Sequence, residues 1–220
     1  MNTVNLSPNP WCTISPTDYD GHMGHPSVNQ TRLLCDVFGD ALSKCSAQSV
    51  AMLGCATGNG LEHIAKKRTR RVTVVDINKL FLEKLAEKYG AQIHGLDVRH
   101  DDLNHIRLDK NAYSLVFAGL VFEFVDWQSL LKKVSGWLIQ NGALSVVLQC
   151  PSETLPDVSS SPYPSLKKVG ALFNMIHPDV FGAECGQLGL CARETEYITL
   201  ASGKSFYIGT YVKKTTTAPL

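Results

Sequence analysis

The clearest chemical feature of this 220-residue chain is a loop of small residues that follows an apolar run. The run covers residues 48–53, and the loop is Gly54-Cys55-Ala56-Thr57-Gly58-Asn59-Gly60. Small residues leave the backbone open to a ligand, and the turn into a following helix offers free N–H groups. We therefore expect a ligand to bind against this loop.

Two carboxylates follow the next two expected strands. A β-branched run ends at Asp76, and a shorter run, residues 91–96, ends at Asp97. Ligands of open α/β sheets bind beyond the carboxyl ends of the strands, so both carboxylates should face the site of the loop. Asp76 is placed to accept hydrogen bonds from two ribose hydroxyls. Asp97 is placed to accept from an adenine amino group while Val98 covers the ring.

This set suits a ligand that contains adenosine, which could be a nicotinamide dinucleotide or a different adenosine cofactor. A nicotinamide dinucleotide requires the pattern G-x-G-x-x-G, because its pyrophosphate lies on the helix N-terminus. Counted from Gly54, the third glycine position holds Asn59; counted from Gly58, it holds His63. The spacing instead resembles G-x-G-x-G with Ala56 in the middle.

The elements that position these residues alternate between strands and helices, which predicts parallel pairing. Four residues, 201–204, separate the last two strands and predict a hairpin with antiparallel pairing. We expect an α/β fold with a doubly wound, mostly parallel seven-stranded sheet, helices on both faces and a C-terminal antiparallel hairpin. The expected strands cover residues 48–53, 71–76, 91–96, 113–118, 143–150, 191–200 and 205–213. The expected helices cover residues 28–42, a segment with Leu61 and Ile64, 79–89, 126–142 and 179–188, whereas 1–27 and 151–164 lack a clean period.

Composition narrows the class of protein. A net charge of +1 makes no global case for nucleic acid or an acidic membrane as partner. The seven cysteines contain no CxxC pair, and no secretory apolar segment is visible at the start. We therefore expect reduced thiols in a cytoplasmic protein. No apolar run approaches the roughly 20 residues that cross a bilayer.

The chain resembles the class I S-adenosylmethionine-dependent methyltransferases over about residues 48–213. The likeness rests on Leu53-Gly54-Cys55-Ala56-Thr57-Gly58, Asp76, Asp97, Leu115-Val116-Phe117-Ala118 and the closing hairpin. A closer likeness, to an uncharacterised bacterial subgroup, rests on Trp11, Asp18-Tyr19-Asp20-Gly21-His22-Met23, Phe122-Glu123-Phe124-Val125-Asp126, Ser145-Val146-Val147-Leu148-Gln149 and Ser202-Gly203-Lys204-Ser205-Phe206-Tyr207. The resemblance implies a Rossmann-like fold and methyl transfer, with S-adenosylmethionine as cofactor and S-adenosylhomocysteine as product. It implies no particular acceptor.

Two positions depart from the family pattern. Met52 stands where the family often has an acid, and Ala56 stands where it often has a second loop glycine. The expected cofactor contacts lie in the loop and at the strand ends: Gly54, Cys55, Ala56, Gly58, Asn59, Asp76, Ile77, Asp97, Val98, Ala118 and Gly119.

The residues that bind the methyl acceptor are harder to identify from the sequence. Methyl transfer from a sulfonium is an in-line displacement with a neutral leaving group, so it requires no fixed set of catalytic residues. The protein mainly positions the nucleophile and excludes water, and a base is needed only if the nucleophile carries a proton. Candidate catalytic residues are Tyr19 and His22, in a segment that commonly forms a lid in this family, and Glu123 after the fourth strand. Tyr19 could equally be a packing aromatic, His22 a capping or solvent residue, and Glu123 a carboxylate that answers a helix dipole.

The sequence leaves three functions open. We expect a methyltransferase with a small-molecule acceptor; the alternatives are a cofactor-binding protein without transferase activity and an RNA or protein methyltransferase. The basic run of residues 66–71 favours the last, but it lies before the second strand, at the amino edge of the sheet. Histidines 63, 94, 100 and 105 lack ligand spacing, so no metal is expected. We expect a single domain over residues 1–220, with a lid or helical segment at 1–46, a cofactor-binding core at 47–213 and a tail at 214–220.

Overall fold

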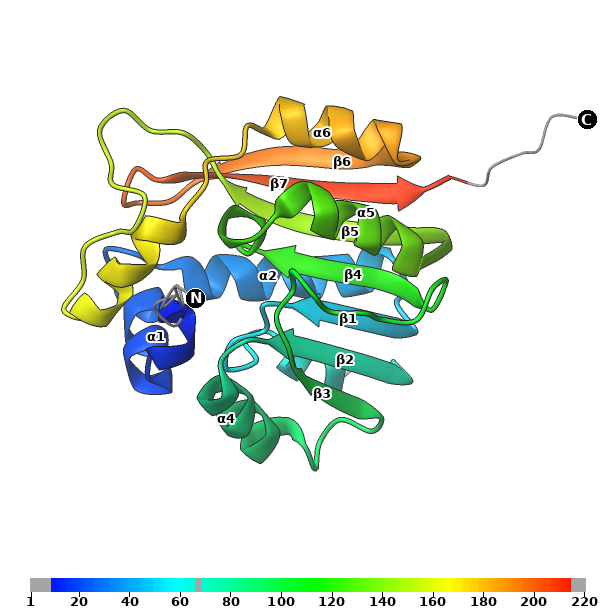
Figure 1. Cartoon of the computed structure of the whole chain (residues 1–220), viewed down its shortest axis with the longest axis horizontal. Helices are drawn as coiled ribbons and strands as arrows, with labels where there is room; N and C mark the ends of the chain where they lie inside the picture. The colour runs from blue at the N-terminus through cyan, green and yellow to red at the C-terminus, as the bar shows by residue number, and fades with distance from the viewer. Residues whose placement is uncertain (1–8, 66–68, 215–220) are drawn as a thin grey trace, which may run out of the picture.

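A seven-stranded sheet with the order β3-β2-β1-β4-β5-β7-β6 runs through the centre of the molecule (Figure 1). The computed structural model describes residues 9–65 and 69–214. β1 to β5 pair in parallel, and β7 runs antiparallel to both β5 and β6. The expected fold class is confirmed, including the closing hairpin. The strands are β1 Ser49–Leu53, β2 Arg71–Asp76, β3 Leu96–His100, β4 Tyr113–Gly119, β5 Leu138–Gln149, β6 Leu190–Thr199 and β7 Ser205–Lys213.

Helices cover both faces of the sheet. The apolar sides of α2, α3 and α4 pack on one face, and those of α5 and α6 pack on the other. Among the described residues, no helix combines the length and apolar character that a membrane span requires. The helices are α1 Pro16–Gly24, α2 Gln30–Lys44, α3 Glu62–Ala65, α4 Lys79–Tyr89, α5 Trp127–Trp137 and α6 Pro178–Gln187, with shorter turns η1 Pro10–Thr13, η2 Phe122–Phe124 and η3 Pro164–Leu172.

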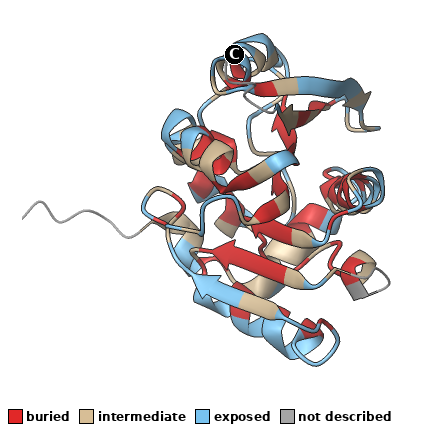
Figure 2. Ribbon diagram, turned by 90° about the vertical axis from the view of Figure 1, so that its right-hand side faces the viewer, coloured by how far each residue is buried: buried red, intermediate tan, exposed pale blue. Residues whose placement is uncertain are grey.

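The central strands are buried on both sides, whereas the edge strands are not (Figure 2). A parallel strand between two helical layers needs apolar residues on both faces, which is why β1, β2 and β4 are nearly continuous apolar runs. The edge strand β3 has the sequence LDVRH and is largely exposed. Its polar pattern explains why sequence periodicity placed the third strand wrongly, at residues 91–96.

A second boundary also differs from the expected one. Asp126 caps α5 by accepting a hydrogen bond from the Ser129 N–H, as expected, but the helix ends at Trp137. Leu138 already pairs with Tyr113 in β4, and the register then shifts before the long parallel stretch of β5. The turn at Asn141, where φ is +61°, lies within β5 and not at the end of the helix.

The N-terminal segment, residues 9–27, is more regular than its composition indicated. It contains η1 and α1, which lie beyond the carboxyl ends of the strands (Figure 1). Ser15 accepts a hydrogen bond from the Asp18 N–H, and Pro16 occupies the first turn of α1. A capping serine followed by proline is a helix-start signal that was visible in the sequence.

Asn78 fastens the N-terminal segment to the sheet. Its side-chain oxygen accepts hydrogen bonds from the Leu80 and Phe81 N–H groups and caps α4. Its amide group donates to the backbone oxygens of Trp11 and Ile14, at 2.8 Å each. A single buried amide therefore joins the start of α4 to the turn before α1.

Close packing then fixes α1 against η3. A Cβ atom on Gly21 would lie 2.2 Å from the Tyr163 ring, so only glycine lets that ring lie against α1. Gly24, three residues further along the helix, has only Thr31 Oγ1 near an added Cβ, at 3.8 Å.

We expect Gly21→Ala to lower the free energy of unfolding by about 1–2 kcal/mol, because the Tyr163 ring must leave its packed position. Gly24→Ala is the matched control and should be neutral or stabilising by up to about 1 kcal/mol, since alanine favours a helix. Chemical denaturation measures both, and hydrogen exchange should show faster opening of α1 and η3 in Gly21→Ala alone. Equal stabilities of the two variants would contradict this account.

Candidate functional site

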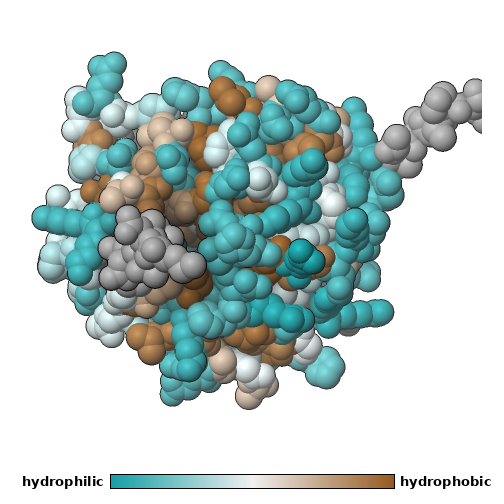
Figure 3. All heavy atoms as spheres, in the orientation of Figure 1, coloured by the Kyte–Doolittle hydropathy of each residue, from teal (hydrophilic) through white to brown (hydrophobic). Residues whose placement is uncertain are grey.

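A cavity of about 1100 Å³, counting its open mouth, lies beyond the carboxyl ends of β1, β2, β4 and β5. Its walls come from the loop after β1, the end of β2, η2, the N-terminal segment and η3. Apolar side chains gather in a hollow on this face of the molecule (Figure 3). The cavity therefore lies where ligands of open α/β sheets bind.

The small-residue loop forms one wall through a strained backbone. Gly54 has a φ of +61°, and a Cβ atom there would lie 2.5 Å from Val121 Cγ2. Ala56 also has a positive φ, +45°, a conformation that costs a residue with a Cβ about 1–2 kcal/mol. This geometry explains why a glycine is common at the position of Ala56. The Ala56 N–H is held by a hydrogen bond of 2.8 Å to Asp76 Oδ2.

Asp76 lies at the end of β2 and lines the cavity with only 7% of its surface exposed. Its other carboxylate oxygen, Oδ1, accepts from the Asn78 N–H at 2.8 Å. Burial raises the pKa of Asp76 to about 6, although backbone N–H groups of Asn78, Ala56 and Ile77 oppose the shift. Each oxygen retains a further lone pair for a ligand hydroxyl.

Tyr19 and His22 both reach the cavity from α1. The Tyr19 ring lies 5.0 Å from that of Phe81, and burial raises the Tyr19 pKa well above its usual range. His22 Nδ1 lies 2.8 Å from Ser161 Oγ. Burial, and then the nearby Lys204 and His25 charges, lower the His22 pKa to about 4. His22 is therefore neutral at physiological pH and a poor proton acceptor.

Glu123 has the most unusual environment in the cavity. Its side chain is fully buried, and Oε1 accepts from the Gln149 N–H at the end of β5, at 2.8 Å. Oε2 is buried, and no residue within 9–65 or 69–214 forms a hydrogen bond with it. Burial raises the pKa of Glu123 to about 7, against the opposing effect of the Gln149 N–H. Glu123 lies in the first turn of the short η2 helix, and its Oε1 is directed to the end of β5.

Contacts that the sequence did not reveal hold the N-terminal segment over the cavity. Asp18 accepts from Ser165 Oγ in η3. Asp20 accepts from Thr57 Oγ1 in the loop and forms an ion pair with Lys84 of α4, at 2.7 Å. The cluster Asp18-Tyr19-Asp20-Gly21-His22 therefore serves mainly to attach α1 to the rest of the site.

The loop after β5 is attached from the hairpin. Lys204 is 3% exposed, and its Nζ donates to the backbone oxygens of Pro156 and Asp157 at 2.9 and 2.8 Å. Burial lowers the Lys204 pKa to about 8, although Asp157 opposes the shift. The same loop contributes Asp157, Val158 and Ser159 to the cavity wall.

The structure brings together part of the expected cofactor set. The expected residues that line the cavity are Gly54, Ala56, Asp76, Ile77 and Gly119, together with Tyr19, His22 and Glu123. Cys55 and Ala118 are buried in the two cores of the sheet, and Asn59 uses its amide to donate to Thr31 O. A Cβ on Gly58 would contact Tyr89 and Leu85, so this glycine permits packing behind the loop.

Asp97 and Val98 lie away from the cavity, and this corrects their expected position. Asp97 pairs with Thr73 in the body of β3 and forms an ion pair with Arg99, at 2.8 Å. The expected strand covered residues 91–96, but β3 begins only at Leu96 and ends at His100. Asp97 therefore lies inside the strand and not beyond its carboxyl end. The cavity is lined after β3 by Asp102, Leu103 and Asn104 instead.

Other lining residues were not expected at the site from the sequence. Six of them, four aromatic side chains and two amides, come from six separate segments: Trp11, Phe81, Phe124, Phe173, Gln30 and Gln149. Trp11 and Phe124 stack edge to face, with ring centroids 5.0 Å apart. Isolated aromatics of this kind are indistinguishable from core residues in a sequence, so only the fold could group them.

Residues 51–146 match a family model described as a methyltransferase domain. The matched segment, less than half of the chain, is similar to a methyltransferase domain. Several solved structures with this fold contain bound S-adenosylhomocysteine. A search of curated proteins finds no significant match to this chain.

Solved structures share the fold of this methyltransferase domain at low sequence identity. The N-methyltransferase NodS from Bradyrhizobium japonicum, in complex with S-adenosyl-L-homocysteine, is 12% identical, with a TM-score of 0.65 over 94% of this chain and 93% of that one. A Burkholderia thailandensis 1,6-didemethyltoxoflavin-N1-methyltransferase is 9% identical, with a TM-score of 0.67 over 98% and 94%. The [4+2]-cyclase SpnF is 13% identical, with a TM-score of 0.66 over 84% and 82%.

We expect Glu123→Gln to stabilise the protein in a pH-dependent way. The unfolded Glu123 ionises near its ordinary pKa of 4.5, whereas the folded one keeps its proton up to about pH 7. The free energy of unfolding of the wild type therefore falls by about 3 kcal/mol as the pH rises from 4.5 to 7, and this loss stays constant at higher pH. Denaturation at pH 4.5 and 7.5 should show the variant gaining that amount relative to the wild type.

The control for this prediction is Glu87→Gln, which removes an exposed carboxylate from α4. Its stability relative to the wild type should stay flat with pH. A flat profile for Glu123→Gln as well would show that the buried carboxyl ionises normally.

Proposed function

We propose that the protein transfers a methyl group from S-adenosylmethionine to a small-molecule acceptor held in the apolar part of the cavity. The observation that carries the proposal is the buried Glu123 carboxyl, whose Oε2 has no hydrogen-bond partner among the described residues. An unpaired buried polar atom costs free energy, and such atoms in a ligand cavity indicate a ligand group that pairs with them.

The donor half of the cavity fits the cofactor. Glycine at position 54 keeps the loop backbone clear, and the Asp76 carboxylate faces the same space. We assign the ribose hydroxyls to Asp76, and the adenine to Ile77 and the Asp102–Leu103 turn. Bound S-adenosylmethionine supplies the methyl group as a sulfonium electrophile and departs as a neutral thioether. Gly54, Ala56 and Gly119 would bring the backbone close to it.

The proposed acceptor half is aromatic and contains the Glu123 carboxyl. Trp11, Phe124 and Phe173 lie in a chain of edge-to-face contacts near Glu123, which suits a flat, weakly polar acceptor. A pKa of about 7 suits Glu123 to accept the proton that an N–H or O–H nucleophile loses as its new bond to carbon forms. The pKa of His22, about 4, makes it a hydrogen-bond partner in place of a base.

Neighbouring structures support a small acceptor. The Burkholderia enzyme was crystallised with 1,6-didemethyltoxoflavin, itself a small molecule. The basic run that favoured RNA or protein lies in part, at residues 66–68, outside the described residues. Arg71 forms an ion pair with Asp109 and lies over the Tyr113 ring at the amino end of β2, away from the cavity.

One observation favours a second candidate, a cofactor-binding protein without transferase activity. SpnF shares this fold and is named as a [4+2]-cyclase, so the fold by itself does not determine the reaction. The two candidates differ in whether S-adenosylhomocysteine is released. The cytoplasmic location and the three-part division of the chain stay predictions.

Asp76→Ala should weaken binding of S-adenosylhomocysteine at least about 30-fold, because hydrogen bonds to a charged acceptor contribute about 1.5–3 kcal/mol each. Titration calorimetry should also show wild-type binding about tenfold weaker at pH 5 than at pH 7.5, since the Asp76 carboxylate takes up a proton near pH 6. Asp76→Asn should lack this pH dependence, and Asp109→Asn should bind as the wild type does. Unchanged affinity in Asp76→Ala would refute the ribose assignment.

The acceptor can be sought by incubating the protein and S-adenosylmethionine with a library of aromatic amines, phenols and N-heterocycles. Mass spectrometry should detect S-adenosylhomocysteine and a product heavier by one methylene. With that acceptor, Glu123→Gln should lower kcat about 10²- to 10⁴-fold and remove the pH limb near 7, with cofactor affinity unchanged. Cofactor binding without turnover of any compound would favour the second candidate.

A further inference from the structure

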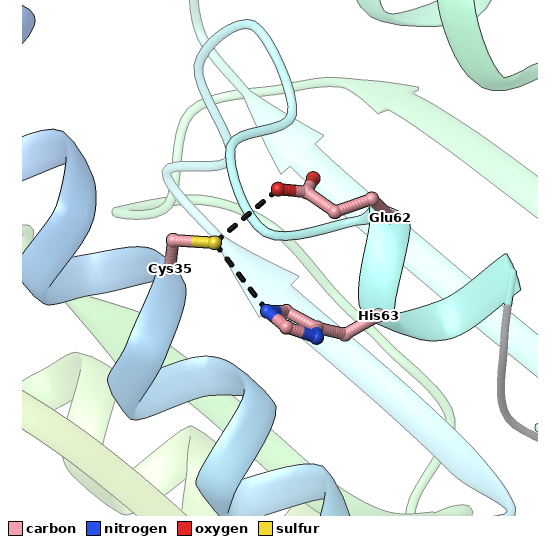
Figure 4. Close-up of side chains that lie close together, drawn as sticks. All are labelled: Cys35, Glu62 and His63. Carbon is pink, nitrogen blue, oxygen red and sulfur yellow. Dashed lines mark hydrogen bonds between the residues drawn. The ribbon is translucent and has the colours of Figure 1, made fainter.

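Three potential metal ligands meet close to the end of the small-residue loop, and none of them is among the residues that line the cavity. Figure 4 shows Cys35 of α2 directed at Glu62 and His63 of α3. Cys35 Sγ lies 3.2 Å from Glu62 Oε1 and 3.4 Å from His63 Nε2. Within residues 9–65 and 69–214, this is the one group of three such side chains whose ligand atoms all lie within 4.8 Å of one another.

Small residues allow α2 and α3 to approach this closely. A Cβ on Gly39 would lie 2.9 Å from His63 Nε2, so the imidazole ring rests directly on α2. Gly60 has a φ of +88°, and a Cβ there would lie 3.5 Å from the Cys35 Cα. The imidazole ring is therefore held against α2, and the backbone of Cys35 lies close to the start of α3.

The carboxylate is also oriented by a neighbour. Tyr89 of α4 donates its hydroxyl to Glu62 Oε2 at 3.0 Å, which leaves Oε1 for the side of Cys35. Ligands of metal ions are commonly fixed by hydrogen bonds of this kind, and losing such a bond lowers metal affinity.

We propose that Cys35, Glu62 and His63 form a zinc site that joins α2 to the helix after the cofactor loop. Zinc bonds of about 2.0–2.3 Å in a tetrahedron separate neighbouring ligand atoms by about 3.4–3.6 Å. The distances from Cys35 Sγ to Glu62 Oε1 and to His63 Nε2, 3.2 and 3.4 Å, are close to that spacing before any adjustment. Thiolate and imidazole together select zinc over magnesium or calcium, which prefer oxygen ligands.

Charge and access are consistent with the site. Binding requires the Cys35 thiol to release its proton to solvent, after which one thiolate and one carboxylate balance the 2+ charge. All three side chains are half-buried, so an ion can enter and a water can complete the tetrahedron. The sequence did not predict this site because its cysteine stands 27 residues before the nearest partner.

The test is a titration of reduced, chelator-treated full-length protein with Co²⁺, a spectroscopic substitute for zinc. We expect one equivalent to produce a thiolate-to-cobalt charge-transfer band and tetrahedral ligand-field bands, which Zn²⁺ then removes. Cys35→Ser should lose the charge-transfer band and bind more than about tenfold more weakly. Cys12→Ser, which removes an exposed thiol, is the matched control and should keep the band.

Two further measurements keep the proposal open to refutation if Cys35→Ser folds poorly. Tyr89→Phe should lower cobalt affinity about tenfold through the lost bond to Glu62. Zn²⁺ should protect Cys35, and not Cys12, from iodoacetamide in peptide mass spectra of the wild type. None of these readouts needs methyl transfer. The proposal fails if the band persists in Cys35→Ser, or if Zn²⁺ leaves Cys35 alkylation unchanged.

Discussion

The buried carboxylate of Asp76 is the constraint on which the arrangement of the site depends. An ion with 7% exposure is stable only if N–H groups surround it, and the loop at Ala56 and the turn at Asn78 supply them. The first of these contacts draws the loop of residues 54–60 onto the end of β2. The second fixes Asn78, which then caps α4 and holds the backbone of Trp11 and Ile14. One carboxylate thus organises the loop, a helix start and the N-terminal segment.

Glu123 contrasts with Asp76 in a way that divides the cavity into two halves. Both oxygens of Asp76 already have N–H partners, and its pKa of about 6 leaves it mostly charged at neutral pH. Glu123 has one paired and one unpaired oxygen, and a pKa of about 7 leaves it able to give or take a proton. The first suits the binding of hydroxyl groups, and the second suits proton transfer beside aromatic walls.

The success of sequence prediction varied with burial. β1, β2 and α4 were placed almost to the residue, because apolar runs between helices and the Asn78 cap leave strong local signals. β3 was misplaced, and Asp97 with it, because an edge strand needs no apolar pattern. α1 was missed although Ser15 and Pro16 marked its start, since the irregular composition around them obscured the signal.

The sequence by itself determined the parallel sheet and the hairpin, because the strands and helices alternate regularly and leave local residue patterns. It also determined that the small-residue loop and Asp76 meet at the ends of β1 and β2, because both follow strands that are adjacent in such a sheet. Only the tertiary structure decided that Asp102 and Leu103, in place of Asp97 and Val98, reach the cavity, since strand register fixes which residues lie at the sheet edge. It also decided the aromatic walls and the meeting of Cys35 with His63. Such groupings arise from the packing of distant segments, and no local pattern of residues records them.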